Sequence, residues 1–157
     1  MSDEPFGDRM FRVVRERLRT VLDDAPGALE RGRDAEVHAL RIAIKRLRYN
    51  LEFTAGLAPG PSGGAMRLLA LMQERLGAHA DAAAFARTYG ALLDALPADD
   101  ERRPGLESLL AAARRDKERA LARARALWDG AGAEPYRERL VASISGVLGS
   151  LSPNDAE

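Results

Sequence analysis

Apolar residues recur along the chain with the spacing of an amphipathic helix, and no segment shows the alternation typical of a β-strand. The pattern therefore predicts an all-α protein built as an up-and-down bundle of about five to six helices. The expected helices cover about residues 8–22, 34–55, 65–76, 79–96, 104–128 and 135–151. We expect the first to end at Asp23–Gly27 and a break at Gly77, since proline and glycine interrupt helices.

One helical domain is predicted over residues 5–151, because no internal repeat or low-complexity linker divides the chain. Residues 1–4 and 152–157 are expected to be flexible termini. A chain of 157 residues can bury roughly 68–70% of the surface that it exposes when unfolded. The last predicted helix carries an apolar stripe that fits either a helix closing the core or a helix facing a partner.

Composition removes several classes of function. Cysteine is absent, so disulfides and thiolate chemistry are excluded, and His38 and His79 are the only imidazoles. We therefore expect no metal site and no cofactor. No apolar run approaches the ~20 residues of a membrane span, and the first residues are polar and acidic, so a cytoplasmic protein is expected.

The formal net charge is zero, which argues against indiscriminate binding to nucleic acids or membranes. The 24 basic residues include only two lysines, Lys45 and Lys117. The arginines fall mostly within the predicted helices, whereas many acids lie in the termini and loops. A neutral chain can therefore still carry strongly basic faces.

One predicted helix has such a face. At about 100° per residue, a single arc of about 100° holds His38, Arg41, Lys45, Arg48, Tyr49 and Glu52. An apolar stripe adjoins it, formed by Val37, Leu40, Ile44, Leu47 and Leu51. The rise from His38 to Arg48 is about 15 Å, so the face carries roughly one cation per turn. Such a ladder suits a linear polyanion better than a single phosphate.

The same face can also be interpreted as a solvated surface that binds no ligand. A basic stripe beside an apolar one is typical of a solvated helix flank, and Arg48 and Glu52 have the spacing of an ion pair. On the helix predicted over residues 104–128, Lys117 falls within the apolar stripe and Arg114 at its edge. Lys117 must reach either an anionic group or water.

The motif as a whole is recognisable. It reads His38-x-x-Arg41-x-x-x-Lys45-Arg46-x-Arg48-Tyr49-x-x-Glu52, followed by Leu71-Met72-Gln73-Glu74-Arg75-Leu76-Gly77 and then Asp81. Over about residues 6–137 the chain closely resembles the conserved histidine α-helical domain (CHAD) family, in particular the second half of that domain. The resemblance implies a helical module that binds inorganic polyphosphate in a basic channel, sometimes at polyphosphate or storage granules.

The resemblance also implies a set of site residues. The polyphosphate-binding residues would be His38, Arg41, Lys45, Arg46, Arg48 and Tyr49, to which we add Arg114 and Lys117 from the long helix. Asp81 matches the family motif and would orient one of the arginines by pairing with it. Family members usually contain two bundles and this chain has room for one, so it works either as a half-site or as a homodimer that rebuilds the double unit. The homodimer is the more attractive hypothesis, because a symmetric pair would lengthen the cationic track.

Catalysis is not expected. The acidic run Asp99–Glu101 is typical of a solvated connection, and the glycine-rich residues 60–64 lack the features of a phosphate-binding loop. The main alternative is a helical adaptor or granule-associated protein whose basic face is merely solvated. Nucleic-acid binding is disfavoured, because the chain has only eight aromatic residues for base stacking.

Overall fold

The computed structural model describes residues 6–57 and 62–151, and within them the chain forms five α-helices and no strand. The helices are α1 (Phe6–Arg31), α2 (Asp34–Leu57), α3 (Gly63–Ala95), α4 (Arg103–Asp129) and α5 (Tyr136–Leu151). The predicted all-α fold is confirmed. The expected flexible termini, residues 1–4 and 152–157, lie outside the described residues. None of the described helices is long and apolar enough to cross a bilayer.

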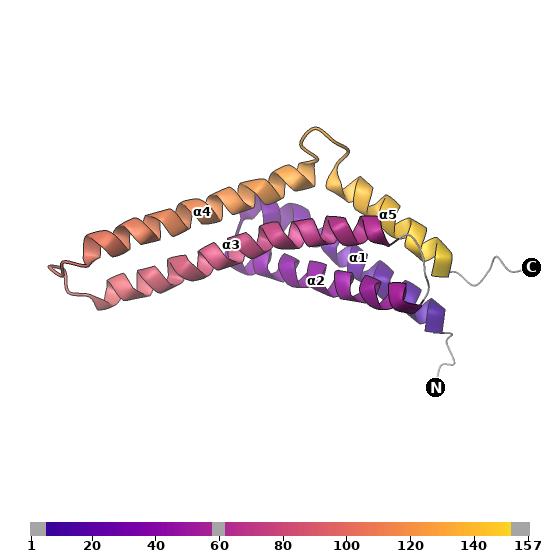
Figure 1. Cartoon of the computed structure of the whole chain (residues 1–157), viewed down its shortest axis with the longest axis horizontal. Helices are drawn as coiled ribbons and strands as arrows, with labels where there is room; N and C mark the ends of the chain where they lie inside the picture. Colours follow the sequence, from indigo (N-terminus) through magenta and orange to yellow (C-terminus); the bar gives the residue numbers. More distant parts are fainter. Residues whose placement is uncertain (1–5, 58–61, 152–157) are drawn as a thin grey trace, which may run out of the picture.

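Successive helices from α1 to α4 run in opposite directions, and α5 then packs back against α1 and α3 (Figure 1). Helix α3 has 33 residues and α2 has 24, so α3 is longer by about 14 Å at 1.5 Å per residue. The far part of α3 therefore pairs only with α4. We call this projecting hairpin, residues 82–116, the arm.

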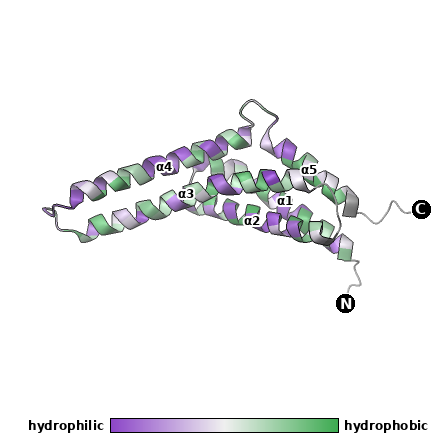
Figure 2. Ribbon diagram, in the orientation of Figure 1, coloured by the Kyte–Doolittle hydropathy of each residue, from purple (hydrophilic) through white to green (hydrophobic). Residues whose placement is uncertain are grey.

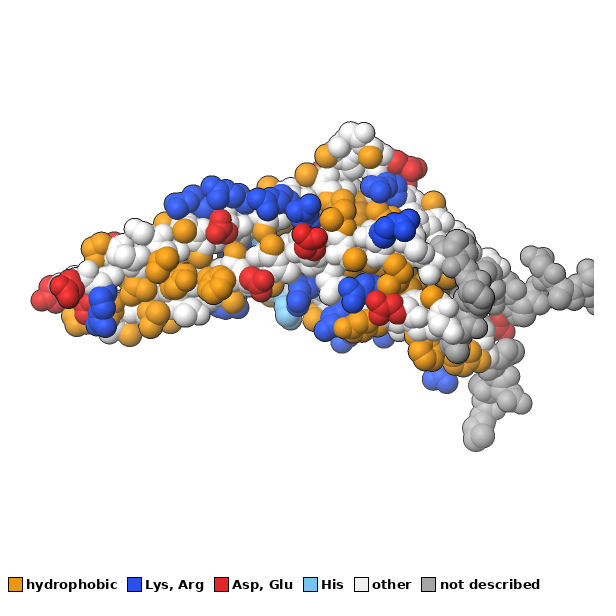
Figure 3. Space-filling model, viewed as in Figure 1, with side chains coloured by type: hydrophobic (Ala, Val, Ile, Leu, Met, Phe, Trp, Pro, Cys, Tyr) orange, Lys and Arg blue, Asp and Glu red, His pale blue; other side chains and the backbone are white. Residues whose placement is uncertain are grey.

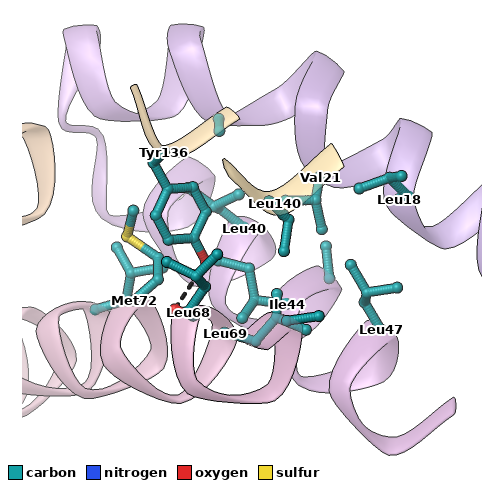
Figure 4. Packing of buried hydrophobic residues seen from close by; sticks show 14 of the residues in the cluster. Leu18, Val21, Leu40, Ile44, Leu47, Leu68, Leu69, Met72, Tyr136 and Leu140 are labelled. Atoms are coloured by element: carbon teal, nitrogen blue, oxygen red, sulfur yellow. Dashed lines mark hydrogen bonds between the residues drawn. The ribbon is translucent and has the colours of Figure 1, made fainter. Parts of the chain in front are cut away.

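The apolar core lies where α1, α2, α5 and the first half of α3 meet (Figure 4). Tyr136, at the start of α5, is fully buried among leucines, and its hydroxyl donates a hydrogen bond of 2.9 Å to the carbonyl oxygen of Leu68. Leu140, Ile144 and Val147 follow it into the core. Helix α5 therefore closes the core, and its apolar stripe is not available to a partner.

Helix α1 does not end at the predicted Asp23–Gly27 run but continues through Pro26 to Arg31. The buried stripe explains this difference, because Ala25, Ala28 and Leu29 continue the spacing set by Val14, Leu18 and Val21. Pro26 sits on the exposed side and removes one backbone donor. The turn comes instead at Gly32, whose φ of 63° and contact with Leu121 leave no room for a Cβ.

The predicted break at Gly77 is also wrong, since α3 runs unbroken through it. Buried residues continue at helical spacing on both sides, from Met72 and Leu76 to His79 and Ala83. A glycine inside a helix costs only about 1 kcal/mol relative to alanine, which packing of this stripe offsets. The other predicted helices begin and end within about two residues of the observed ones, which is the usual uncertainty of helix ends.

Candidate functional site

Helix α2 turns a different kind of side chain to each side. Its core side is fully buried and consists of Val37, Leu40, Ile44, Leu47 and Leu51. The neighbouring side carries His38, Arg41, Lys45 and Arg48, which we call the α2 basic face. Because these residues recur every three or four positions, the cations rise along one edge of the helix.

The cations of the α2 basic face are partly buried yet poorly satisfied. Arg41, Lys45 and Arg48 are half-buried, whereas His38 is exposed. The Nε atoms of Arg41 and Arg48 are buried without a hydrogen-bond partner among the described residues. A buried donor without an acceptor costs free energy, so an anionic ligand that supplied oxygens here would gain affinity.

Tyr49 organises the C-terminal end of the α2 basic face. The Lys45 Nζ and the Arg48 Cζ each lie 5.5 Å from the centre of the Tyr49 ring. A ring holds cations at this distance through its negative face. Tyr49 thus contacts two cations of the α2 basic face, one turn before it and directly before it on the helix.

Glu52 partly neutralises the positive charge at this end of the α2 basic face. Its Oε1 lies 3.3 Å from the Nε of Arg48, which is the ion pair that the sequence spacing allowed. The side chain of Glu52 is 45% exposed, and such i, i+4 pairs are worth only about 0.3–0.5 kcal/mol. Arg48 can therefore exchange this partner for a ligand at small cost.

A partly buried ionic cluster lies at the other end of α2. The Nζ of Lys117 donates to both carboxylate oxygens of Asp34, at 3.1 and 3.4 Å. The Nε2 of His79 lies 3.7 Å from the same carboxylate. Burial lowers the pKa of His79, Asp34 raises it and Lys117 lowers it further. Lys117 therefore reaches an acid rather than water, and it ties α4 to the start of α2.

His38 opens onto a pocket of about 230 Å³ between α2 and α3. Arg87, from the next turns of α3, lines the same pocket together with His79. The pocket adds one further cation, Arg87, to those of the α2 basic face, and the acid Asp34 lines it as well. Arg87 and His79 are thus candidates for the site that the sequence analysis did not select.

Three selected residues lie apart from this arrangement. Arg46 faces α1 and lines a groove with Arg17, on another side of α2. Arg114 is exposed on α4. Asp81 is exposed on α3, and no ion pair joins it to any residue that the structure describes, so its expected pairing with an arginine is not formed. The acids that pair with selected cations are instead Asp34, with Lys117, and Glu52, with Arg48.

The missed residues share one cause. His79, Ala83 and Arg87 follow one another at intervals of four residues on α3, and they keep phase with Leu76 only if the helix is continuous. Because the sequence analysis predicted a break at Gly77, it could not place these residues on the same side of one helix as Leu76. Asp34 could have been noticed, because it lies one turn before His38 on the same helix.

Acidic side chains form no metal-like cluster among the described residues. In the α3–α4 turn, Asp100 accepts hydrogen bonds of 2.9 and 2.7 Å from the Arg102 side chain. These bonds lower the pKa of Asp100 to about 2. The acidic run at 99–101 is therefore part of the turn that joins the two helices.

The structure thus defines an all-α protein with a cationic face along its second helix. The sequence pattern of the CHAD domain matches residues 2–89, which is more than half of the chain, and the chain belongs to this family. The match covers α1, α2 and most of α3, including the whole α2 basic face, and it ends before α4. No curated protein and no solved structure matches the chain.

Proposed function

We propose that this protein binds inorganic polyphosphate along the α2 basic face and holds it without cleaving it. The observation that carries the proposal is the row of cations His38, Arg41, Lys45 and Arg48, in which the buried Nε of Arg41 has no hydrogen-bond partner in the described chain and the Nε of Arg48 faces only the partly exposed Glu52. Membership of the CHAD family supports the same ligand.

The spacing of the cations favours a linear anion. A helix advances about 5.4 Å per turn, so cations one turn apart meet successive groups of an extended chain rather than one phosphate. Arginine supplies a planar fork to phosphate oxygens and lysine a compact charge. Binding should release condensed counterions, so affinity should fall steeply as salt rises.

The direct test replaces Arg41, Lys45 and Arg48 together by Glu and measures retention on immobilised polyphosphate. We expect retention to be lost while helicity by circular dichroism is unchanged, since these side chains lie outside the apolar core. The matched control replaces the exposed α1 residues Arg9, Arg15 and Arg19 by Glu, which changes the net charge equally. Retention of polyphosphate by a folded α2 variant would refute the proposal.

Holding without cleavage is a separate part of the proposal. Hydrolysis of a phosphoanhydride normally uses carboxylates that hold a metal ion beside the phosphate. The carboxylates at the ends of the α2 basic face are Asp34 and Glu52, and both already pair with cations. Polyphosphate incubated with the protein and Mg²⁺ should keep its length on a gel, and release of orthophosphate above that of a buffer blank would contradict this part.

We further propose a homodimer, because the arm leaves apolar side chains uncovered. Phe85 and Leu92 on α3 and Leu109 on α4 are 56%, 47% and 48% exposed, and Phe85 stacks on Tyr89 at 6.1 Å. A second arm would cover these side chains and add a second basic face. Light scattering should show a dimer that Leu92→Glu dissociates, and a monomeric wild-type chain would reject this proposal.

Polyphosphate binding would also direct the protein to polyphosphate granules, where the fluorescently tagged chain should gather and the α2 triple variant should not. The alternative ligand is nucleic acid, which shares the electrostatics. A competition experiment decides between them. Polyphosphate should displace single-stranded RNA from the protein at a lower concentration of phosphate groups than RNA needs to displace polyphosphate, and the opposite result would favour nucleic acid.

A further inference from the structure

A second group of arginines lines a pocket that shares no residue with the α2 basic face. Arg75 on α3, Arg123 on α4 and Arg139 on α5 line one pocket of about 470 Å³. The rest of its wall is apolar or backbone and comes from Ala126, Leu127, Gly130, Ala131 and Ala133. The volume lies within the ~300–1,000 Å³ of typical small-molecule sites.

The fold fixes all three arginines in place. Arg75 and Arg123 lie on the antiparallel helices α3 and α4, which pack against each other. Arg139 follows Tyr136 by one turn, and Tyr136 is anchored in the core by its bond to Leu68. The pocket is therefore lined from three helices that pack against one another and from the turn between α4 and α5.

The turn between α4 and α5 is equally constrained. Gly130 has a φ of 80°, and a Cβ there would lie 2.8 Å from both the Ala133 oxygen and Pro135. The Ala131 N–H donates to the Ala126 carbonyl oxygen at 3.1 Å. This turn forms one wall of the pocket, so the wall does not depend on a loose loop.

The charges in this pocket are uncompensated. No acidic side chain lines it, and no ion pair joins any of its three arginines to another residue within 6–57 or 62–151. By contrast, Arg119, one turn before Arg123 on α4, pairs with Asp116 at 3.2 Å. Figure 3 shows basic side chains gathered along the outer edge of α4 and over the start of α5. Like charges that line one pocket repel one another, and an anion bound between them would offset that repulsion.

We propose that this pocket is a second anion site that takes a diphosphate group. Three guanidinium forks match the oxygens of two adjacent phosphates, and the wall of Ala126, Leu127 and Ala131 offers apolar contact to a carbon-bearing part. The diphosphate comes either from an organic diphosphate or from the end of a polyphosphate chain. The site shares no residue with the α2 basic face, so it stands independently of the proposed function.

The test is isothermal titration of the full chain with ADP, AMP and pyrophosphate at 150 mM salt. We expect ADP and pyrophosphate to bind at least tenfold more tightly than AMP, because AMP presents one phosphate instead of two. Arg123→Glu should weaken both by tenfold or more, since it removes a charge-assisted contact and adds repulsion. Arg123 is exposed, so the variant should fold normally.

The matched control is Arg115→Glu, an exposed arginine two turns earlier on α4, which changes the net charge equally and should leave both affinities within twofold. Tighter binding of ADP than of pyrophosphate identifies an organic diphosphate, and the reverse identifies the end of a polyphosphate chain. Equal losses in both variants, or no binding at millimolar concentration, would overturn the site. The triple Glu variant of α2 should keep its pyrophosphate affinity, which separates failure of this site from failure of the polyphosphate face.

Discussion

The bundle and the arm of this protein are both helical, but they are packed with different side chains. In the bundle the fully buried side chains are large, such as Leu40, Ile44, Leu69 and Tyr136. In the arm the buried side chains are mostly small, among them Ala82, Ala83 and Ala113. Hydrophobic residues recur along the projecting part of α3 (Figure 2), and two of them, Phe85 and Leu92, are exposed.

The comparison shows that one helix, α3, can pack through large side chains in the bundle and through alanines in the arm. Alanine lets two helices approach closely but buries little apolar area, so each alanine contact contributes less than a buried leucine. The bundle is held by its core. The arm depends on the strong helix preference of its sequence, on the alanine seam and on the bonds at its tip, so we expect it to open first.

The largest loss of stability should come from shortening a buried side chain in the bundle core. Leu40→Ala removes a side chain with 0% exposure and should lower the free energy of unfolding by about 2–5 kcal/mol. Leu92→Ala removes the same atoms from a side chain that is 47% exposed and should cost less than about 0.5 kcal/mol in the monomer. Urea unfolding of both variants measures the difference, and equal losses would erase the contrast between the two regions.

An added side chain in the alanine seam should have the next largest effect. Ala113→Leu inserts a larger side chain where only 6% of Ala113 is exposed, and overpacking of this kind costs about 1–3 kcal/mol. Ala91→Leu, on the exposed side of the same arm, is the matched control and should be close to neutral. Hydrogen exchange should show that the loss is confined to the arm; a uniform loss over the bundle would mean that the two regions unfold together.

Much of the bundle could be predicted from the sequence, because the spacing of apolar residues within a single segment determines which side of each helix is buried. The core stripe of α2 and its basic face both follow from 3.6-residue periodicity within one segment. The division between bundle and arm could not be predicted, because it depends on α3 outlasting α2, and Gly77 looked like an end. The sequence reports Gly77 but not the buried stripe that carries the helix past it.

The candidate site shows the same limit. The spacing of His38, Arg41, Lys45 and Arg48 placed them on one face in advance, whereas Arg46, one residue from Lys45, turned out to face α1. The partner of Lys117 is Asp34, 83 residues away in the chain. No local pattern connects two such residues, so only the packing of α2 and α4 against the same helix, α3, could reveal the pair.

His79 lies at the junction of the two regions and should make stability depend on pH. Its pKa is lowered in the folded chain, chiefly by burial, with Asp34 and Lys117 acting in opposite directions. Below about pH 6.5 the unfolded chain binds a proton on this imidazole more readily than the folded chain does. The stability contributed by neutral His79 is therefore complete above that pH and is lost as the pH falls.

The measurement is the free energy of unfolding in urea between pH 7.5 and 5.5, compared between the wild type and His79→Gln. Glutamine stays neutral over this range, so the variant should show a smaller decline toward acid pH. The ionisations of the carboxylates are shared by both proteins and cancel in the difference. A wild type and variant with parallel curves would show that burial does not disfavour the charged form of His79.

The smallest effect is expected at the tip of the arm, where Arg103 closes the end of α3. Its Nη1 donates to the carbonyl oxygens of Leu93 and Leu96, at 2.9 and 3.1 Å, and such a cation at a helix C-terminus is worth about 0.3–1 kcal/mol. Arg103→Ala should therefore speed hydrogen exchange of the Leu96 amide while leaving the urea midpoint almost unchanged. No residue of the bundle core lies at the tip of the arm. A shift of the urea midpoint as large as that of Leu40→Ala would therefore mean that the arm and the bundle unfold as one cooperative unit.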